Sequence, residues 1–191
     1  MQQPSGAFLL AATGDTTGPH HEALVLVAVH GDEGSLGFLL NRPTDRDLAT
    51  ALDRFGIETR GIGLPPMAAA TQVCRGGGVR PDVAWLLYDA RRVDEHPEDS
   101  CLLSESVGVT ASPDAVVQMI QSETPLLFVF GHLTWEPGAL DHEIAQGRWV
   151  RTPVDPALVF EEPMPARWTE AICGSLGVTR PWLGDARFMN A

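Results

Sequence analysis

The sequence contains no lysine, and all 13 of its basic side chains are arginines. A chain without lysine can neither form a Schiff base with a carbonyl compound nor supply the lysine of a Walker-type phosphate loop. The arginines are outnumbered by 25 acidic residues, which gives a net charge of −12. Because non-specific binding to nucleic acid depends on basic side chains that displace counterions, direct nucleic-acid binding is not expected.

Cysteine is also scarce, and Cys74, Cys101 and Cys173 are widely spaced without a C-x-x-C pair. A disulfide framework or a zinc ribbon is therefore not predicted, and we expect neither a metal nor another cofactor. Cys173 lies one position away from the apolar stripe of the last predicted helix. A half-exposed thiol with a redox-sensing role is one interpretation of it, and an ordinary reduced thiol is the other.

Long apolar runs are missing as well. The sequence has no stretch of about 18 apolar residues that would span a membrane, and no basic segment precedes its short apolar stretch near the N-terminus. We therefore expect a cytoplasmic protein without membrane contact. With 191 residues, of which 44% are apolar, the chain is predicted to form one globular domain over residues 1–191.

Apolar patterning predicts a mixture of strands and helices. Helices are expected over residues 48–55 and from Pro113, Pro137 and Pro165 onward, the last ending before Gly177. Residues 61–70 and 94–100 are predicted to be exposed loops. Since strands run in succession and helices come late, the fold class is α+β. The predicted strands are 7–12, 23–30, 37–41, 71–75, 83–88 and 125–133.

The first candidate site lies in a segment rich in tryptophan, histidine, proline and acidic residues. This segment is FGHLTWEPGALDHEIAQGRWVRTP, from Phe130 to Pro153. Glu136 and Glu143 are seven residues apart, so they share a face if both lie on the helix. Together with His132 they could act in general acid–base catalysis or hold a divalent cation. Alternatively the two tryptophans of this segment anchor the core, and Glu143 accepts hydrogen bonds from the backbone.

The second candidate site is a glycine-rich turn after a strand. Glycines there could turn backbone amides toward an anion between two arginines. A tight turn with a close approach of two backbones is the alternative. The turn lacks the lysine and the hydroxyl residue of a phosphate loop. Its residues are Arg75, Gly76, Gly77, Gly78 and Arg80.

Four blocks of this chain, taken in order, resemble the AlgH/YqgE family (UPF0301, DUF179) over residues 8–178, leaving residues 179–191 as a C-terminal tail. Gly76, Gly77 and Val79 are similar to the family's G-G-P-V element, although Gly78 replaces its proline, and Pro165–Val178 is similar to its closing helix. Ala139 stands where the family usually has glutamine. The other matching motif residues are His30, Gly34, Gly37, Asn41 and Pro43 in one block, and Trp135, Gly138, Leu140, Glu143, Ile144 and Trp149 in another.

The resemblance implies a bifurcated, mostly antiparallel sheet curled into a pseudo-barrel and flanked by helices. It also implies a transcriptional regulator without a secure biochemical activity. Given the acidic charge, we expect a non-enzymatic regulatory or binding protein that acts through a protein partner or a small ligand. The alternative is a hydrolase-type enzyme that uses His132, Glu136 and Glu143 in a pocket walled by Trp135 and Trp149.

Overall fold

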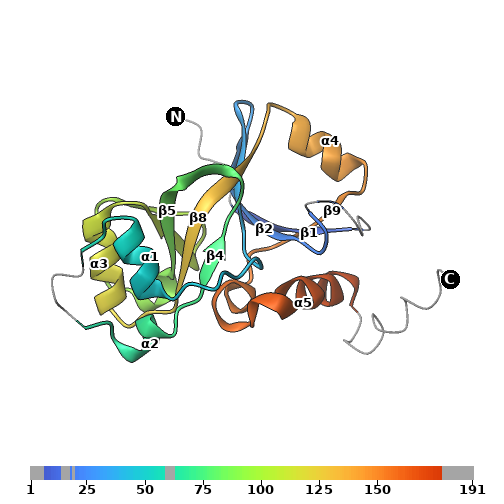
Figure 1. Ribbon diagram of the computed structural model, residues 1–191. Helices are drawn as coiled ribbons and strands as arrows, with labels where there is room; N and C mark the ends of the chain where they lie inside the picture. Colours follow the sequence, from blue (N-terminus) through green and yellow to red (C-terminus); the bar gives the residue numbers. More distant parts are fainter. Residues whose placement is uncertain (1–6, 14–17, 19, 59–62, 178–191) are drawn as a thin grey trace.

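The computed structural model describes residues 7–13, 18, 20–58 and 63–177. It is an α+β fold in which one mixed sheet is surrounded by helices (Figure 1). The strands are β1 (Phe8–Ala12), β2 (Leu24–Gly31), β3 (Gly34–Leu39), β4 (Val73–Arg75), β5 (Val79–Asp89), β6 (Ser100–Leu102), β7 (Val107–Thr110), β8 (Leu126–Trp135) and β9 (Trp149–Thr152). The helices are α1 (Leu48–Arg54), α2 (Pro66–Ala69), η1 (Ala90–Arg92), α3 (Pro113–Gln121), α4 (Ala139–Ala145), η2 (Ala157–Glu161) and α5 (Met164–Leu176).

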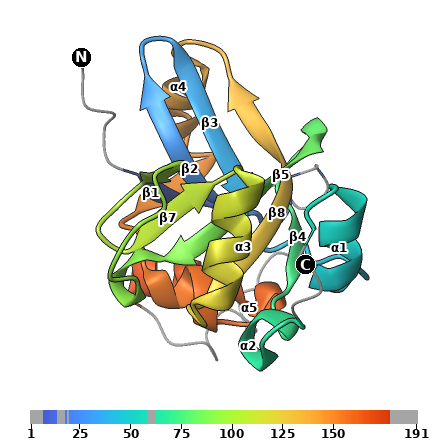
Figure 2. The same ribbon diagram turned by 90° about the vertical axis from the view of Figure 1, so that its left-hand side faces the viewer.

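The sheet divides along β8. Its strand order is β6-β7-β5-β8-β3-β2-β1-β9, and β4 adds a parallel pairing to β8, whereas all other pairings are antiparallel. The first half of β8, up to Phe130, pairs with β4 and β5, and its last residues, Leu133–Trp135, pair with β3. The two halves diverge from this strand, so the sheet curls into a half-barrel (Figures 1 and 2).

Gly131 marks the division. Leu127 and Val129 face the central core, whereas Leu133 and Trp135 face a different cluster under α4. Strict alternation along a strand would place all four side chains on one face. Gly131 has φ +68°, and a Cβ there would lie 2.6 Å from the carbonyl oxygen of Gly77. Glycine at this position therefore allows both the shift of alternation and the close passage of the neighbouring chain.

Both faces of the sheet are covered. The central core lies between the two halves and is closed by η2 and α5, a second cluster packs under α1, α2 and α3, and a third packs under α4. Strand β1 shows the consequence, because Leu9 and Ala11 face the central core while Phe8 and Leu10 face the cluster under α4. This two-sided burial explains why its sequence is a continuous apolar run.

The structure confirms the α+β class and the six predicted strands, with shifted ends, and it corrects other predictions. Strands β6, β7 and β9 were not predicted. The segment expected as a loop over 61–70 contains α2, and residues 61–62 lie outside the described part. Helix α4 begins at Ala139, after the left-handed Gly138 (φ +74°), and not at Pro137. Cys173 is buried rather than half-exposed.

Candidate functional site

Glu143 is held by two indole rings. Its Oε2 accepts hydrogen bonds from Nε1 of Trp149 at 2.8 Å and from Nε1 of Trp135 at 3.1 Å. The two indoles meet edge to face with 6.4 Å between their centroids, and Nη1 of Arg148 lies 3.9 Å from Oε1 of Glu143. The sequence-based alternative, hydrogen bonding to the backbone, was wrong about the partner. The contacts make Glu143 the polar link between α4, β8 and β9.

The other two members of the first candidate site lie elsewhere. Glu136 follows the last residue of β8 and is exposed, so it does not share a helix face with Glu143. His132 is buried, and its ring packs edge-on against Trp85 with 6.1 Å between centroids. Burial, and next the positive charge of Arg80, lower the pKa of His132, so its imidazole is neutral at pH 7. Within the described part of the chain, His132 Nδ1 and Trp85 Nε1 have no hydrogen-bond partner.

The glycine-rich turn passes directly over β8. A Cβ on Gly77 would lie 2.1 Å from the carbonyl group of His132, and one on Gly76 would lie 2.5 Å from the carbonyl oxygen of Gly131. The amide of Gly76 donates to the carbonyl of Phe130 at 2.9 Å, so this amide does not face an anion. The close approach of two backbones, one of the two sequence-based alternatives, is therefore present. Anion binding between Arg75 and Arg80 stays a prediction.

The motif residues of the first block hold the backbone in place. The Asn41 side chain accepts from the amide of Leu24 at 3.0 Å and donates to the carbonyl of Glu22 at 2.6 Å. The ring of His30 bridges Ser35, 2.9 Å from Nδ1, and Asp141 of α4, 3.3 Å from Nε2. These contacts join β2, β3 and α4. Among the described residues, no group of three or more His, Cys, Asp and Glu side chains is placed to hold a metal ion.

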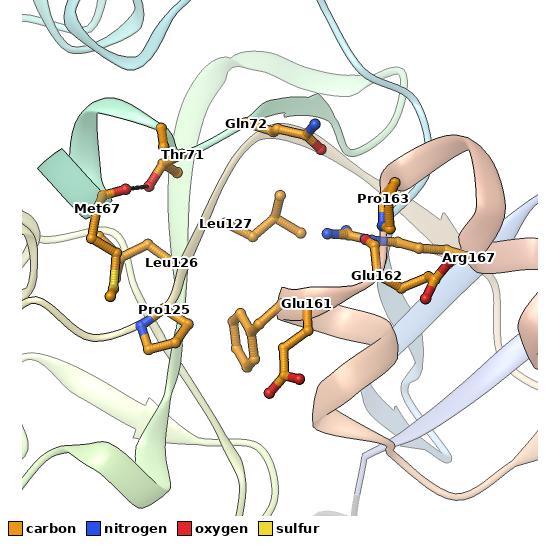
Figure 3. Close-up of a pocket in the computed structure, with 12 residues that line it drawn as sticks. Met67, Thr71, Gln72, Pro125, Leu126, Leu127, Glu161, Glu162, Pro163 and Arg167 are labelled. Carbon is orange, nitrogen blue, oxygen red and sulfur yellow. Dashed lines mark hydrogen bonds between the residues drawn. The ribbon is translucent and has the colours of Figure 1, made fainter.

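A pocket opens on the other side of the molecule, between α2 and the turn that joins η2 to α5 (Figure 3). Its volume is about 380 Å³. Apolar side chains form much of its wall, and Oγ1 of Thr71, which follows α2, donates to the carbonyl of Met67 in that helix at 3.3 Å. The lining residues are Met67, Ala70, Thr71, Gln72, Pro125, Leu126, Leu127, Phe160, Glu161, Glu162, Pro163 and Arg167.

Arg167 is the buried charged residue among those that line this pocket, and it was missed in the sequence. Only 3% of it is exposed. Its Nη1 donates to the carbonyl of Leu40 at 2.7 Å, and its Nε donates to the carbonyl of Glu162 at 2.8 Å. The available signal was helical spacing, because Met164, Arg167 and Ala171 are separated by three and four residues and share the buried face of α5. An arginine on such a face must be satisfied within the fold.

The fold defines the class of protein: a mostly antiparallel sheet curled into a half-barrel, with helices on both faces. It is similar to the solution structure of AlgH from Pseudomonas aeruginosa, with a TM-score of 0.73 at 22% identity over 96% of each chain. It is also similar to the crystal structure of DIP2367 from Corynebacterium diphtheriae, with a TM-score of 0.64 at 19% identity, covering 91% of this chain and 87% of the other.

The sequence comparisons fix the family. The AlgH-like (DUF179) family model matches residues 8–179, and the chain belongs to this family. It is 32% identical over 182 residues to a UPF0301 protein of Thioalkalivibrio sulfidiphilus, covering 94% of this chain and 93% of that protein. It is 33% identical over 172 residues to a UPF0301 protein of Anaeromyxobacter dehalogenans, covering 86% and 84%. The family relationship predicted from the motifs is thus confirmed.

Proposed function

We propose that this protein is a non-enzymatic regulatory protein of the cytoplasm that binds a small ligand in the pocket at Arg167. One observation carries the proposal. The pocket combines apolar walls with a buried guanidinium, as small-molecule sites commonly combine an apolar surface with a few polar groups, and its lining contains no serine, cysteine or histidine. Such a lining suits recognition better than catalysis by a serine or cysteine nucleophile or by a histidine base.

The proposed regulation works through the ligand and a protein partner, without direct contact with DNA. The net charge of −12 and the absence of lysine support this, because DNA contact relies on basic side chains against phosphate. The pocket wall includes residues of α2, β8 and α5. A ligand that contacts all three would favour one arrangement of these elements over others, and a partner could recognise that arrangement.

The hydrolase alternative is less well supported. His132, Glu136 and Glu143 do not line this pocket, and Glu143 is engaged by two indoles.

No described helix is long and apolar enough to cross a membrane.

The test is a thermal-shift screen of the full chain against metabolites, with a variant whose pocket is filled. Ala70 is exposed and lines the pocket, whereas the neighbouring Ala69 is exposed but does not. A ligand at a hundred times its Kd adds about 2.7 kcal/mol of stability, which corresponds to roughly 5–10 °C for a chain of this size. We expect such a shift to survive Ala69→Trp and to disappear in Ala70→Trp.

Three results would argue against the proposal. A shift that persists in Ala70→Trp would place the ligand elsewhere. Conversion of the ligand into a product during incubation, followed by NMR, would favour the hydrolase alternative. A complete lack of ligands across the screen would leave a protein partner as the route of regulation and would remove the pocket from the function.

A further inference from the structure

The buried charge of Arg167 lacks the compensation that another buried charge, that of Asp89, has. Asp89 is 0% exposed, and Nη2 of Arg91 lies 2.7 Å from its Oδ2, with Nε of Arg92 at 3.6 Å. For Arg167, the described part of the chain provides two backbone carbonyls and no carboxylate in an ion pair. A buried charge is costly unless it is paired and hydrogen-bonded, so Arg167 is incompletely compensated.

The guanidinium has donors left over. It carries five N–H bonds in a planar fork, and its two bonds to the protein are made by Nε and Nη1. Figure 3 shows the guanidinium end of Arg167 pointing toward Leu127, inside the ring of pocket residues. The remaining donors can therefore be reached by a molecule in the pocket.

Neighbouring groups offset the charge of Arg167 only in part. Burial raises the pKa of the Cys74 thiol to about 11, so this thiol is neutral at physiological pH. Burial lowers the pKa of Arg167 to about 10, against the opposing influence of Cys74 and then Glu162, so Arg167 remains a cation there. The negative charge of Glu162 acts on Arg167 in the direction that raises its pKa, and Glu161 is exposed at the pocket.

We propose that the ligand of this pocket carries a small oxyanion, a carboxylate or a phosphate monoester, which the free N–H groups of Arg167 bind while an apolar portion packs on Leu126, Leu127 and Phe160. This inference rests on the proposed function and adds the chemical class of the ligand. A planar guanidinium matches the geometry of both oxyanions, and apolar walls strengthen the attraction by excluding water.

Charge changes at two exposed residues of the pocket, which form its mouth, test the inference while Arg167 itself stays unchanged. Gln72 and Glu161 both line the pocket and are exposed, so Gln72→Glu and Glu161→Gln should fold normally. We expect the first to weaken hexanoate binding, and the second to strengthen it, on the order of three- to tenfold at low salt. Hexylamine, a cation of the same length, should respond in the opposite direction, and hexanol should not respond to either variant. Affinities would be measured by NMR titration of the full chain.

A direct readout comes from Arg167 itself. Its Nε–H signal should move when hexanoate or inorganic phosphate is added, and Arg167→Met should abolish binding of both while Arg167→Lys retains part of it. A stronger response to phosphate than to hexanoate would assign the phosphate monoester class, and the reverse would assign the carboxylate class. If Arg167→Met fails to fold, the two mouth variants still decide the question.

The inference and the proposed function fail in different ways. If hexylamine or hexanol binds more tightly than hexanoate, and Ala70→Trp abolishes that binding, the pocket binds ligands but is not specific for anions. If a metabolite binds elsewhere, or if neither the probes nor the metabolites bind, both proposals fall.

Discussion

Glu143 and Arg167 are two charged side chains inside the same fold, and they are satisfied in opposite ways. Glu143 is surrounded by donors that belong to the protein, with two indole N–H groups on one oxygen and Arg148 near the other. Arg167 donates to two backbone carbonyls and turns its remaining N–H groups toward a pocket. The first arrangement is closed and suits a structural role, whereas the second is open and suits binding.

A segment dense in functional residue types therefore need not be a binding site. The segment around Trp135 combines aromatic, acidic and histidine residues, and its glutamate joins three elements of structure. The pocket residues are inconspicuous in the sequence and come from four separate segments around residues 67–72, 125–127, 160–163 and 167. Only the fold brings them together.

The largest loss of stability should come from removing the Glu143 carboxylate. Glu143→Ala leaves two indole N–H groups without an acceptor, one of them on the buried Trp149. Since hydrogen bonds to a charged group contribute about 1.5–3 kcal/mol each, we expect a loss of about 4 kcal/mol in the free energy of unfolding. The loss would appear as a lower urea midpoint with an unchanged slope.

Glu143→Gln is the matched control for this prediction. It keeps an acceptor oxygen but removes the charge, so the expected loss is only about 1 kcal/mol. Neither variant should alter hexanoate binding at Arg167, because Glu143 does not line the pocket. Loss of binding in a folded Glu143→Gln protein would contradict the assignment of Glu143 to structure alone.

A smaller effect is expected at the glycine-rich turn. In Gly77→Ala the new Cβ would collide with the backbone of His132, which cannot move without displacing β8. Overpacking of this kind costs about 1–3 kcal/mol. Gly78→Ala is the control, because nothing lies within 4 Å of its Cβ position, and it should change the unfolding free energy by less than about 1 kcal/mol. Equal losses in both variants would show that glycine is needed at these positions for its conformational freedom. The close approach of the neighbouring backbone would then not be the reason.

The sequence predicted the fold better than it predicted the pocket. Five of the six predicted strands have five or more residues, whereas β6, β7 and β9 have only three or four and give too short a pattern. The sixth, β4, is as short as these, with three residues, and was predicted as part of a longer segment over 71–75. His132 and the glycine turn were predicted as separate sites, yet β5 and β8 bring them together through the pairing of Val79 with His132. Arg167 was missed because its pocket depends on contacts between segments that are distant in sequence.

Removal of the Arg167 charge should cost less than removal of the Glu143 carboxylate. Arg167→Met keeps a long apolar stem and relieves the cost of an incompletely compensated charge. It also leaves the carbonyls of Leu40 and Glu162 without this donor, so we expect a net loss of about 2 kcal/mol. Added phosphate should raise the melting temperature of the wild type and leave that of Arg167→Met unchanged. A loss as large as that of Glu143→Ala would indicate a primarily structural arginine.

The smallest effect on stability is expected for the cysteines, whose reactivity should follow their exposure. Cys74 and Cys173 are buried and Cys101 is exposed, and only a thiolate that reagents can reach reacts readily. We therefore expect a thiol reagent to label one cysteine per native chain, at Cys101, and all three after unfolding in urea. Cys101→Ser should abolish native labelling without a measurable change in stability, because its side chain is exposed on the edge strand β6. Native labelling of Cys173 at the rate of Cys101 would instead show that α5 opens readily, and a redox-sensing role for that thiol would regain support.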